Sequence, residues 1–432
     1  MTMPNISRRL LLGAAATMPA VIGSAARAQS NAPLSVLAHR VHQTVATGTQ
    51  GGDATAPWTR ARGTSVQWTT FDTGPLWERL QRETTLQQTS VDIGFVLNAQ
   101  VAPRSAQLFE PLDEWLRRDP IEDLPDMFPG LIDGYRVGGA LVAIPFRHAS
   151  SGLHYNEELF AERGISTPPT TIEEMADFAR RATYRRPDGT PVTGLVMPGV
   201  SYPNVIDIAR AWDGDFVTAD FRCVADQPPM LNAIRLLREL FQAGAFPRNF
   251  AAISTEDVNT WMQQGRGAIA LQSMGRNRIY NDPQRSRFPG KIRTMAVPIS
   301  ATLRGRYEVA PAKVEFWGMA IPRNSRRKDL AWSFIKAMAT KEATLAAALN
   351  GNGPVRNSTY EDPRLRNLIP YAEEERRVLR VARVPLPAFD EASRAGDIFK
   401  EEAEAAVLGM KTPEAAMAAV VARVTPLLPR GS

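Results

Sequence analysis

Residues 144–156 read IPFRHASSGLHYN, and this stretch decides how the rest of the chain is interpreted. An apolar run ends where a buried strand should stop, and Arg147 and His148 follow at once. The chain then continues as an extended segment. Burying a guanidinium without a partner is costly. Arg147 should therefore face a carboxylate, water or a polar ligand.

Short apolar strands alternate with helical stretches on both sides of this segment. Before it, strands are predicted at 34–38, 65–71 and 91–97, and residues 73–84 have the pattern of a helix. After it, a further strand is expected at 316–322. Strands separated by helices of this length predict βαβ units, an α/β fold class and a mainly parallel sheet.

Two helices later in the chain have clear start signals. Thr170 or Thr171 precedes the first, with Glu173 or Glu174 three residues further on, which is the spacing of a capping box. The second begins with Thr412 as the N-cap and a proline at the first helical position.

Length and composition indicate a globular protein with room for two or three domains. The chain has 432 residues, 44% of them hydrophobic, and a formal net charge of +6. Residues 1–28 contain three arginines and no acid, which leaves 6 − 3 = +3 for the remainder. That charge is too small to indicate a nucleic-acid partner. The single cysteine, Cys223, excludes an internal disulfide.

The first 28 residues have the pattern of an export signal. A basic start with SRRLLL at 7–12 precedes an apolar stretch, and ARA at 26–28 is a cleavage site of the A-x-A type. We expect cleavage after Ala28 and a periplasmic product. The SRRLLL run is similar to the twin-arginine motif and favours that export route, with the general secretory route left open.

Four segments line up, in order and spacing, with one protein family. They are GALVAIPFRHASSGLHYNEELFAERGISTPPTTIEEMADFAR at 139–180, MQQGRGAIALQSMG at 262–275, FWGMAIPRNSRRKDLAWSFIKAMA at 316–339 and GNGPVRNSTYED at 351–362. Through them the chain resembles the extracellular solute-binding proteins of ABC importers, in the sugar-binding family 1 that includes maltose-binding protein. The resemblance runs from about residue 34 to residue 424.

The resemblance implies a type II periplasmic-binding-protein fold, in which two α/β lobes enclose a ligand cleft and are joined by several crossings. It also implies a monomeric receptor that binds a small carbohydrate, polyol or sugar derivative and delivers it to a membrane ABC permease, with no catalysis, metal or cofactor. The crossings would lie near 146–150, 314–317 and 352–356. The implied division is 1–28 as the signal, 29–148 plus 315–352 as the first lobe, and 149–314 plus 353–428 as the second.

Candidate ligand contacts come from strand ends and from aromatic rings. Ligands of open α/β sheets bind beyond the carboxyl ends of the strands, where loops converge. Sugar rings present apolar C–H faces that pack on aromatic planes, and the resemblance places several such rings near the cleft. The candidates are Arg147, His148, Ser150, Trp317, Arg276, Trp212, Tyr202, Asn98, His39, Arg40 and Arg356.

Departures from the maltose binders leave an anionic solute open. Ala149 stands where those proteins place an acid at the first crossing. Guanidinium groups bind carboxylate and phosphate through two parallel hydrogen bonds. A sugar acid or a phosphorylated polyol would therefore suit a cationic cleft, which could be formed by Arg147, Arg276, Arg356, His39 and Arg40.

Two other interpretations stay open. Arg147 could instead form a structural ion pair across the hinge with Glu315. An exported two-lobed hydrolase or lyase could also place an active site between its lobes. No H-E-x-x-H, G-x-S-x-G, P-loop or C-x-x-C motif is present, and His39 with His42 is a weak pair for a metal site.

Overall fold

A computed structural model describes residues 32–429 of the chain. The predicted export signal and its cleavage site lie outside the described residues. Within this part of the chain, no helix combines the length and the apolarity that a membrane crossing requires.

One sheet runs through the whole molecule, with nine strands among the described residues. Its order is β2-β1-β3-β11-β6-β9-β8-β7, with β10 paired to β6, and β4 and β5 form a separate short hairpin. The strands predicted before residue 100 are confirmed as β1, β2 and β3, and the strand expected at 316–322 as β11. The strands are β1 Leu34–His39, β2 Val66–Phe71, β3 Ile93–Leu97, β4 Arg136–Val137, β5 Ala140–Leu141, β6 Ile144–Asn156, β7 Tyr184–Arg185, β8 Pro191–Val196, β9 Gly267–Ser273, β10 Ile292–Met295 and β11 Val314–Ala320.

The sheet is mixed, so the prediction of a mainly parallel sheet was wrong. β1 pairs in parallel with β2 and β3, and β8 with β9, as βαβ units require. β11 is antiparallel to β3 and β6, and β6 is antiparallel to β9 and β10. The reason is that β6 and β11 carry the chain between the two halves of the molecule in opposite directions.

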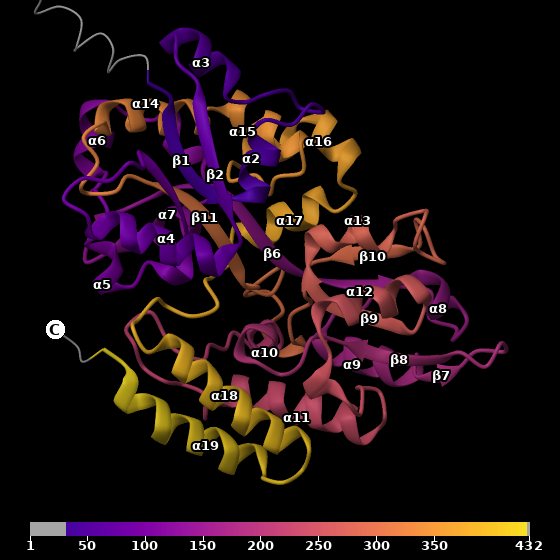
Figure 1. Cartoon of the computed structure of the whole chain (residues 1–432). Helices are drawn as coiled ribbons and strands as arrows, with labels where there is room; N and C mark the ends of the chain where they lie inside the picture. Colours follow the sequence, from indigo (N-terminus) through magenta and orange to yellow (C-terminus); the bar gives the residue numbers. More distant parts are fainter. Residues whose placement is uncertain (1–31, 430–432) are drawn as a thin grey trace, which may run out of the picture.

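The strand β6 belongs to two lobes. Its residues 144–150 pair with β11, whereas residues 151–156 pair with β9 and β10. Two separate hydrophobic cores lie on either side of this change of partner. We call the part whose core includes Phe146 the first lobe, and the part whose core includes Leu153 the second lobe. Figure 1 shows β6 running from the group around β1, β2 and β11 to the group around β7, β8 and β9.

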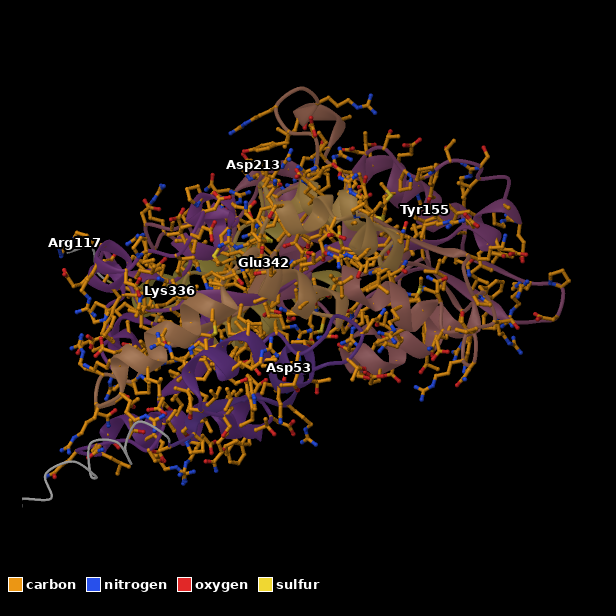
Figure 2. All side chains as sticks on the ribbon, turned by 90° about the horizontal axis from the view of Figure 1, so that it is seen from above. Asp53, Arg117, Tyr155, Asp213, Lys336 and Glu342 are labelled. Carbon is orange, nitrogen blue, oxygen red and sulfur yellow. The ribbon has the colours of Figure 1, made fainter. Side chains whose placement is uncertain are left out.

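Helices surround the sheet in both lobes. The long helices α18 and α19 pack on each other and on α11 in the second lobe (Figure 1). Figure 2 shows Arg117 and Lys336 of the first lobe toward one end of the molecule and Tyr155 of the second lobe toward the other. The helices are α2 Arg40–Ala46, α3 Ala56–Arg62, α4 Thr73–Thr85, α5 Pro103–Ala106, α6 Asp113–Arg118, α7 Pro129–Asp133, α8 Glu157–Ala161, α9 Ile172–Arg181, α10 Tyr202–Ala209, α11 Pro228–Gln242, α12 Thr255–Gln264, α13 Asn277–Tyr280, α14 Lys328–Met338, α15 Lys341–Leu349, α16 Pro363–Leu368, α17 Ala372–Leu379, α18 Ala392–Val407 and α19 Pro413–Val424.

The predicted helix starts are confirmed at α9 and α19. The hydroxyl of Thr171 accepts a hydrogen bond from the backbone N–H of Glu174 at 3.1 Å, and Thr412 does the same for Ala415. The carboxylate of Glu174 in turn accepts from the N–H of Thr170 at 2.7 Å. The two threonine bonds satisfy N–H groups that the first turn of a helix leaves unpaired. The carboxylate of Glu174 bonds the residue before the N-cap, so the N-cap at Thr171 is confirmed but the full capping box is not formed.

Packing places the last crossing later in the chain than the expected boundary at residue 353. Val355 and Tyr360 belong to the core of the first lobe, and Leu386 belongs to the core of the second. Helix α17 contributes residues to both cores. The chain therefore passes into the second lobe after α17, because the segment before it still covers the first lobe.

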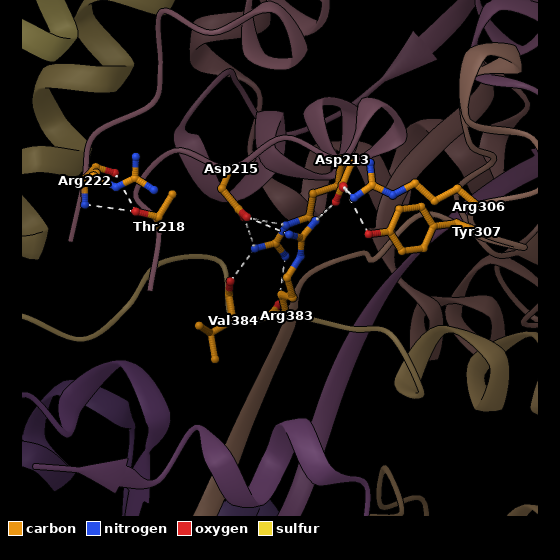
Figure 3. A network of polar contacts seen from close by, with 9 residues as sticks. Asp213, Asp215, Thr218, Arg222, Arg306, Tyr307, Arg383 and Val384 are labelled. Atoms are coloured by element: carbon orange, nitrogen blue, oxygen red, sulfur yellow. Dashed lines mark hydrogen bonds and ion pairs between the residues drawn. The ribbon is translucent and has the colours of Figure 1, made fainter. Parts of the chain in front are cut away.

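An ion network joins two crossing segments to the second lobe (Figure 3). Arg210, only 1% exposed, donates to the carboxylate of Asp215 at 2.8 and 3.1 Å and to the carbonyl of Arg383 at 2.9 Å. Arg383 donates to Asp215 and to Asp213, each at 2.9 Å. The N–H of Val314, at the start of β11, donates to the carbonyl of Arg383 at 3.0 Å. The two crossings therefore run side by side and are bonded to the same lobe.

Candidate functional site

A cavity of about 780 Å³ lies beside β6 at the junction of the lobes. It is lined by residues 147–149, 348 and 351–353 of the first lobe, by residues 273, 275, 277–279 and 281–284 of the second lobe, and by residues 368–371 and 375 around the start of α17. Small-molecule sites occupy about 300–1,000 Å³. The cavity is therefore large enough for a solute of the size of a sugar.

A second cavity, of about 630 Å³, adjoins the first at Tyr371. Its charged side chains are already paired within the protein. Arg293 is bonded to Glu157 at 2.7 and 3.0 Å, and Arg377 to Glu374 at 3.0 Å. The second cavity therefore offers less unsatisfied polar chemistry than the cavity beside β6, which we take as the candidate site.

Arg147 lines the candidate site without a partner of its own. The side chain is partly buried, and its Nε atom is buried with no hydrogen-bond partner. No carboxylate oxygen of residues 32–429 lies within 4.0 Å of the guanidinium, so an ion pair with Glu315 does not form. Burial alone lowers the pKa of Arg147. Such a group needs a polar partner from outside the protein.

His148 and Ser150 belong to a buried hydrogen-bond network that borders the same cavity at His148 and Glu375. The imidazole Nε2 of His148 lies 3.0 Å from the hydroxyl of Tyr360, which donates to Glu375 at 2.9 Å. The hydroxyl of Ser150 donates to the same carboxylate at 2.8 Å. All four side chains are buried, and burial raises the pKa of Glu375. This network attaches β6 to α17, so both candidates have internal partners.

A pH dependence of stability follows from His148. Burial, with the neighbouring charge of Arg147, lowers its pKa from 6.5 to about 3. Below pH 6.5 the unfolded chain binds a proton that the folded chain refuses, so stability is complete above that pH and is lost as the pH falls toward 3. The expected loss is about 1.4 kcal/mol per pH unit for each such histidine. His154, with a pKa lowered to about 4, acts in the same direction.

Urea unfolding at pH 7.5, 6.0 and 5.0 measures this dependence. The variant His148→Gln keeps an amide that can donate to Tyr360 but cannot titrate. Its free energy of unfolding should fall less steeply between pH 6.5 and 5.0 than that of the wild type, by about 1.4 kcal/mol per unit. Equal slopes would show that His148 is not the group that resists protonation.

The candidates at the strand ends of the first lobe lie close together. His39 caps α2, and its Nε2 lies 3.9 Å from Asp72, as does the guanidinium of Arg40. Asn98 has a structural role, because its buried amide oxygen accepts the N–H of Phe316 at 3.0 Å. His39 and Arg40 therefore remain available at the edge of the first lobe, and Asn98 does not.

Trp317 lies beside Arg147 in the sheet. The two residues are paired across β11 and β6, so both side chains leave the sheet on the same face. The indole is partly buried and lies 4.9 Å from the imidazole of His42, between ring centroids, and 6.3 Å from that of His39. One aromatic plane thus stands next to the unpaired guanidinium.

The remaining candidates do not converge on this point. Tyr202 and Trp212 pack against the core of the second lobe, and burial followed by the charge of Glu315 raises the pKa of Tyr202 to about 12. Arg276 lies 3.9 Å from Glu256. Neither Trp212 nor Arg276 lines the cavity beside β6.

Arg356 corrects the expectation of a cleft with many cations. Its guanidinium is fully buried and donates to three carbonyl groups at 2.7 to 2.8 Å and to the carboxylate of Asp126 at 3.2 Å. These bonds use its donors inside the first lobe. Arg356 therefore holds the segment after residue 353 in place, and its guanidinium, 0% exposed, does not line the cavity.

Several cavity residues were not predicted. Tyr371, Glu375 and Gln50 line the cavity, and Asn352 has a buried amide oxygen without a partner there. The segment around Glu375 reads AEEERR, which has the appearance of a solvated helix face. Only the GNG sequence at 351–353 gave a local signal, because glycine permits close approach of two backbones.

Residues 49–345 match the family model for the bacterial extracellular solute-binding proteins. The chain belongs to this family. The two-lobed fold and the cavity between the lobes are what a solute-binding protein needs. Export to the outside of the cytoplasmic membrane is part of the family description.

Two curated relatives of this solute-binding protein are named as binding proteins. A mannitol-binding protein of Pseudomonas aeruginosa is 23% identical over 323 residues, covering 69% of this chain and 68% of that protein. A probable ABC transporter-binding protein of Deinococcus radiodurans is 22% identical over 268 residues, covering 58% and 60%. The solute-binding protein described here thus spans only part of the length of each relative.

Solved structures show the same fold. The sugar-binding protein MalE of Xanthomonas citri has a TM-score of 0.77 at 19% identity, over 92% of this chain and 97% of that one. A solute-binding protein of Agrobacterium radiobacter in complex with ribitol has a TM-score of 0.70 at 21% identity, over 92% and 98%. These similarities confirm the predicted two-lobed α/β fold.

Proposed function

We propose that this protein is a periplasmic receptor that binds a small sugar or polyol between its lobes and delivers it to a membrane ABC permease. One observation carries the proposal. In a chain of the solute-binding family, the cavity of about 780 Å³ takes its walls from both lobes. A ligand that contacts both walls favours the closed arrangement, because only that arrangement makes all of the contacts.

The class of solute is supported by two of the relatives. One is named for mannitol, and one solved structure contains ribitol. Both are open-chain polyols, which match a cavity bordered by amide, hydroxyl and guanidinium groups. A micromolar binder needs about 8 kcal/mol of binding free energy, which a few charge-assisted hydrogen bonds and one aromatic contact can supply.

Export and assembly belong to the same proposal. The signal at 1–28 is cleaved after Ala28, with the twin-arginine route favoured by its sequence. The mature protein acts as a monomer and releases its solute unchanged to the permease. The exported family to which the chain belongs supports this assignment.

Thermal unfolding with a panel of solutes tests the proposal. The panel contains mannitol, ribitol, glucitol, glucose and maltose. A solute at 100 times its Kd adds about 2.7 kcal/mol to the stability of the folded state, so at least one member should raise the Tm by several degrees in a saturable way. The same solute should reduce the radius of gyration in solution scattering, because the lobes close.

The solute recovered after long incubation distinguishes a receptor from an enzyme. Recovery of the solute in chemically unchanged form supports a receptor. Conversion of the solute would instead support the exported hydrolase or lyase. If no sugar, polyol or sugar acid raises the Tm in a saturable way, the proposed solute class is contradicted.

A further inference from the structure

The candidate site contains a guanidinium that the fold leaves unsatisfied. The two arginines that are most deeply buried, Arg210 and Arg356, each bond to a carboxylate and to backbone carbonyls. Arg147 differs from them, because its buried Nε has no hydrogen-bond partner and its guanidinium forms no ion pair within residues 32–429. It is also the one of these three that lines the cavity.

The groups around Arg147 do not compensate its charge. His39, His42 and His148 are its charged or titratable neighbours, and the positive charge of Arg147 contributes to lowering the pKa of all three. Near neutral pH these imidazoles are uncharged, so none of them compensates the charge of Arg147. Glu375 borders the cavity but is bonded to Ser150 and Tyr360.

Glu315 places a negative charge on the same face of the sheet as Arg147. It lies two residues before Trp317 on β11, on the same face of the strand, and is paired with Ala149. Its charge, after burial, contributes to raising the pKa of Tyr202 in the second lobe. A carboxylate at that end repels an anion and accepts hydrogen bonds from hydroxyl groups. The face thus has a cationic end at Arg147 and an acidic end at Glu315.

We propose that the solute is a polyhydroxy compound with an anionic oxygen group, carboxylate or phosphate, and that Arg147 binds this group. The inference rests on the proposed function and narrows its solute class. The planar guanidinium offers parallel donors that match a carboxylate or a phosphate. Trp317 and Glu315 do not line the cavity itself, but they are paired with its lining residues Arg147 and Ala149 on the same face of the sheet. The carbon chain therefore extends from Arg147 over the indole, with its hydroxyl groups toward Glu315.

Matched pairs of acids and neutral polyols test the inference by calorimetry and thermal unfolding. The pairs are gluconate with glucitol, mannonate with mannitol, and ribonate with ribitol, and glucitol 6-phosphate and inorganic phosphate form a separate arm. We expect one acid to bind about 10–100-fold more tightly than its neutral partner, and its affinity to fall with added salt. The arm that binds identifies carboxylate or phosphate as the recognised group.

Variants of Arg147 supply the decisive comparison. In Arg147→Met the preference for the acid should disappear, and in Arg147→Lys it should be reduced but present. Arg285→Met is the matched control, because Arg285 is exposed, 3.9 Å from Asp282, and does not line the cavity. It should retain the full preference.

The stability of the ligand-free variants separates binding from a structural role. Arg147→Met should melt at the same temperature as the wild type or higher, because the substitution removes an unpaired, partly buried cation. A lower Tm for both Arg147→Met and Arg147→Lys would show a structural role and overturn the inference.

The outcomes also separate this inference from the proposed function. Equal or tighter binding of the neutral partners, lost alike in Arg147→Met, would overturn the anionic assignment and leave a polyol receptor. An acid that binds equally well to Arg147→Met would overturn the role of Arg147. Binding of no acid, phosphate or neutral polyol would overturn both.

Discussion

Replacing Arg210 by methionine is expected to destabilise the protein by about 3–5 kcal/mol, as removal of one member of a buried ion pair does. The guanidinium is 1% exposed and has four hydrogen bonds, two to Asp215 and one each to the carbonyls of Arg383 and Val384. Without it, Asp215 keeps only Arg383 as a side-chain partner, the carbonyl of Val384 loses the donor from Arg210, and the carbonyl of Arg383 keeps only the N–H of Val314.

Urea unfolding at pH 7.5 measures this loss, and Arg222→Met is the control. Arg222 lies in the same part of the second lobe and is bonded to Asp220 at 2.7 Å, but it is 71% exposed. Exposed pairs of this kind contribute about 0–1 kcal/mol. Similar losses for the two variants would show that the buried network around Arg210 is not the source of the stability.

The same variant should loosen the crossings between the lobes. The N–H of Val314 and the carbonyl of Arg383 are bonded to each other, and Arg210 holds that carbonyl from the other side. Hydrogen exchange at Val314 and Arg383 should therefore become faster in Arg210→Met, while exchange in β1 stays unchanged. Uniformly faster exchange would indicate a general loss of stability instead.

Gly353→Ala is expected to cost about 2–4 kcal/mol, at or above the usual 1–3 kcal/mol of overpacking. A Cβ atom at this position would lie 2.2 Å from the carbonyl oxygen and 3.1 Å from the carbonyl carbon of His148. The N–H of His148 also donates to the carbonyl of Gly353 at 3.2 Å. The backbone segments around Gly353 and His148 must therefore separate. Both residues line the cavity, so its shape changes as well.

Gly275→Ala is the matched control within the same cavity. The nearest atoms to its added Cβ are the hydroxyls of Ser273 at 3.8 Å and Tyr371 at 4.0 Å, which is ordinary van der Waals contact. Its free energy of unfolding should stay within about 0.5 kcal/mol of the wild type. If Gly353→Ala lowers the free energy of unfolding no more than Gly275→Ala does, residue 353 does not approach β6 as closely as described.

Local patterns predicted the elements well. The apolar runs before residue 100 became β1, β2 and β3, and the threonines before residues 172 and 413 became N-caps. Periodicity and capping depend on residues a few positions apart, so they can be read without the fold. The two lobes were implied by the resemblance of four segments to a known family, and not by local patterns.

The pairing of the arginine side chains could not be predicted from local sequence. Arg147, Arg276 and Arg356 each begin a short polar stretch and Arg210 lies among apolar residues, but no neighbouring residue in the sequence shows which of them has a partner. The partners of Arg356 include Asp126, 230 residues earlier, and a partner of Arg210 lies 173 residues later. Whether a guanidinium is satisfied inside the fold depends on these distant segments. The prediction of five converging cations could therefore not be corrected from the sequence.

The sequence alone determined the α/β elements, the family and the need of Arg147 for a polar partner, because each of these is encoded in short stretches. Tertiary structure alone decided that His148 and Ser150 face α17, that Arg356 is interior, and that Arg147 remains unpaired at a cavity between lobes. The physical reason is that pairing of buried polar groups is set by contacts between segments far apart in the chain, and only the folded chain brings those segments together.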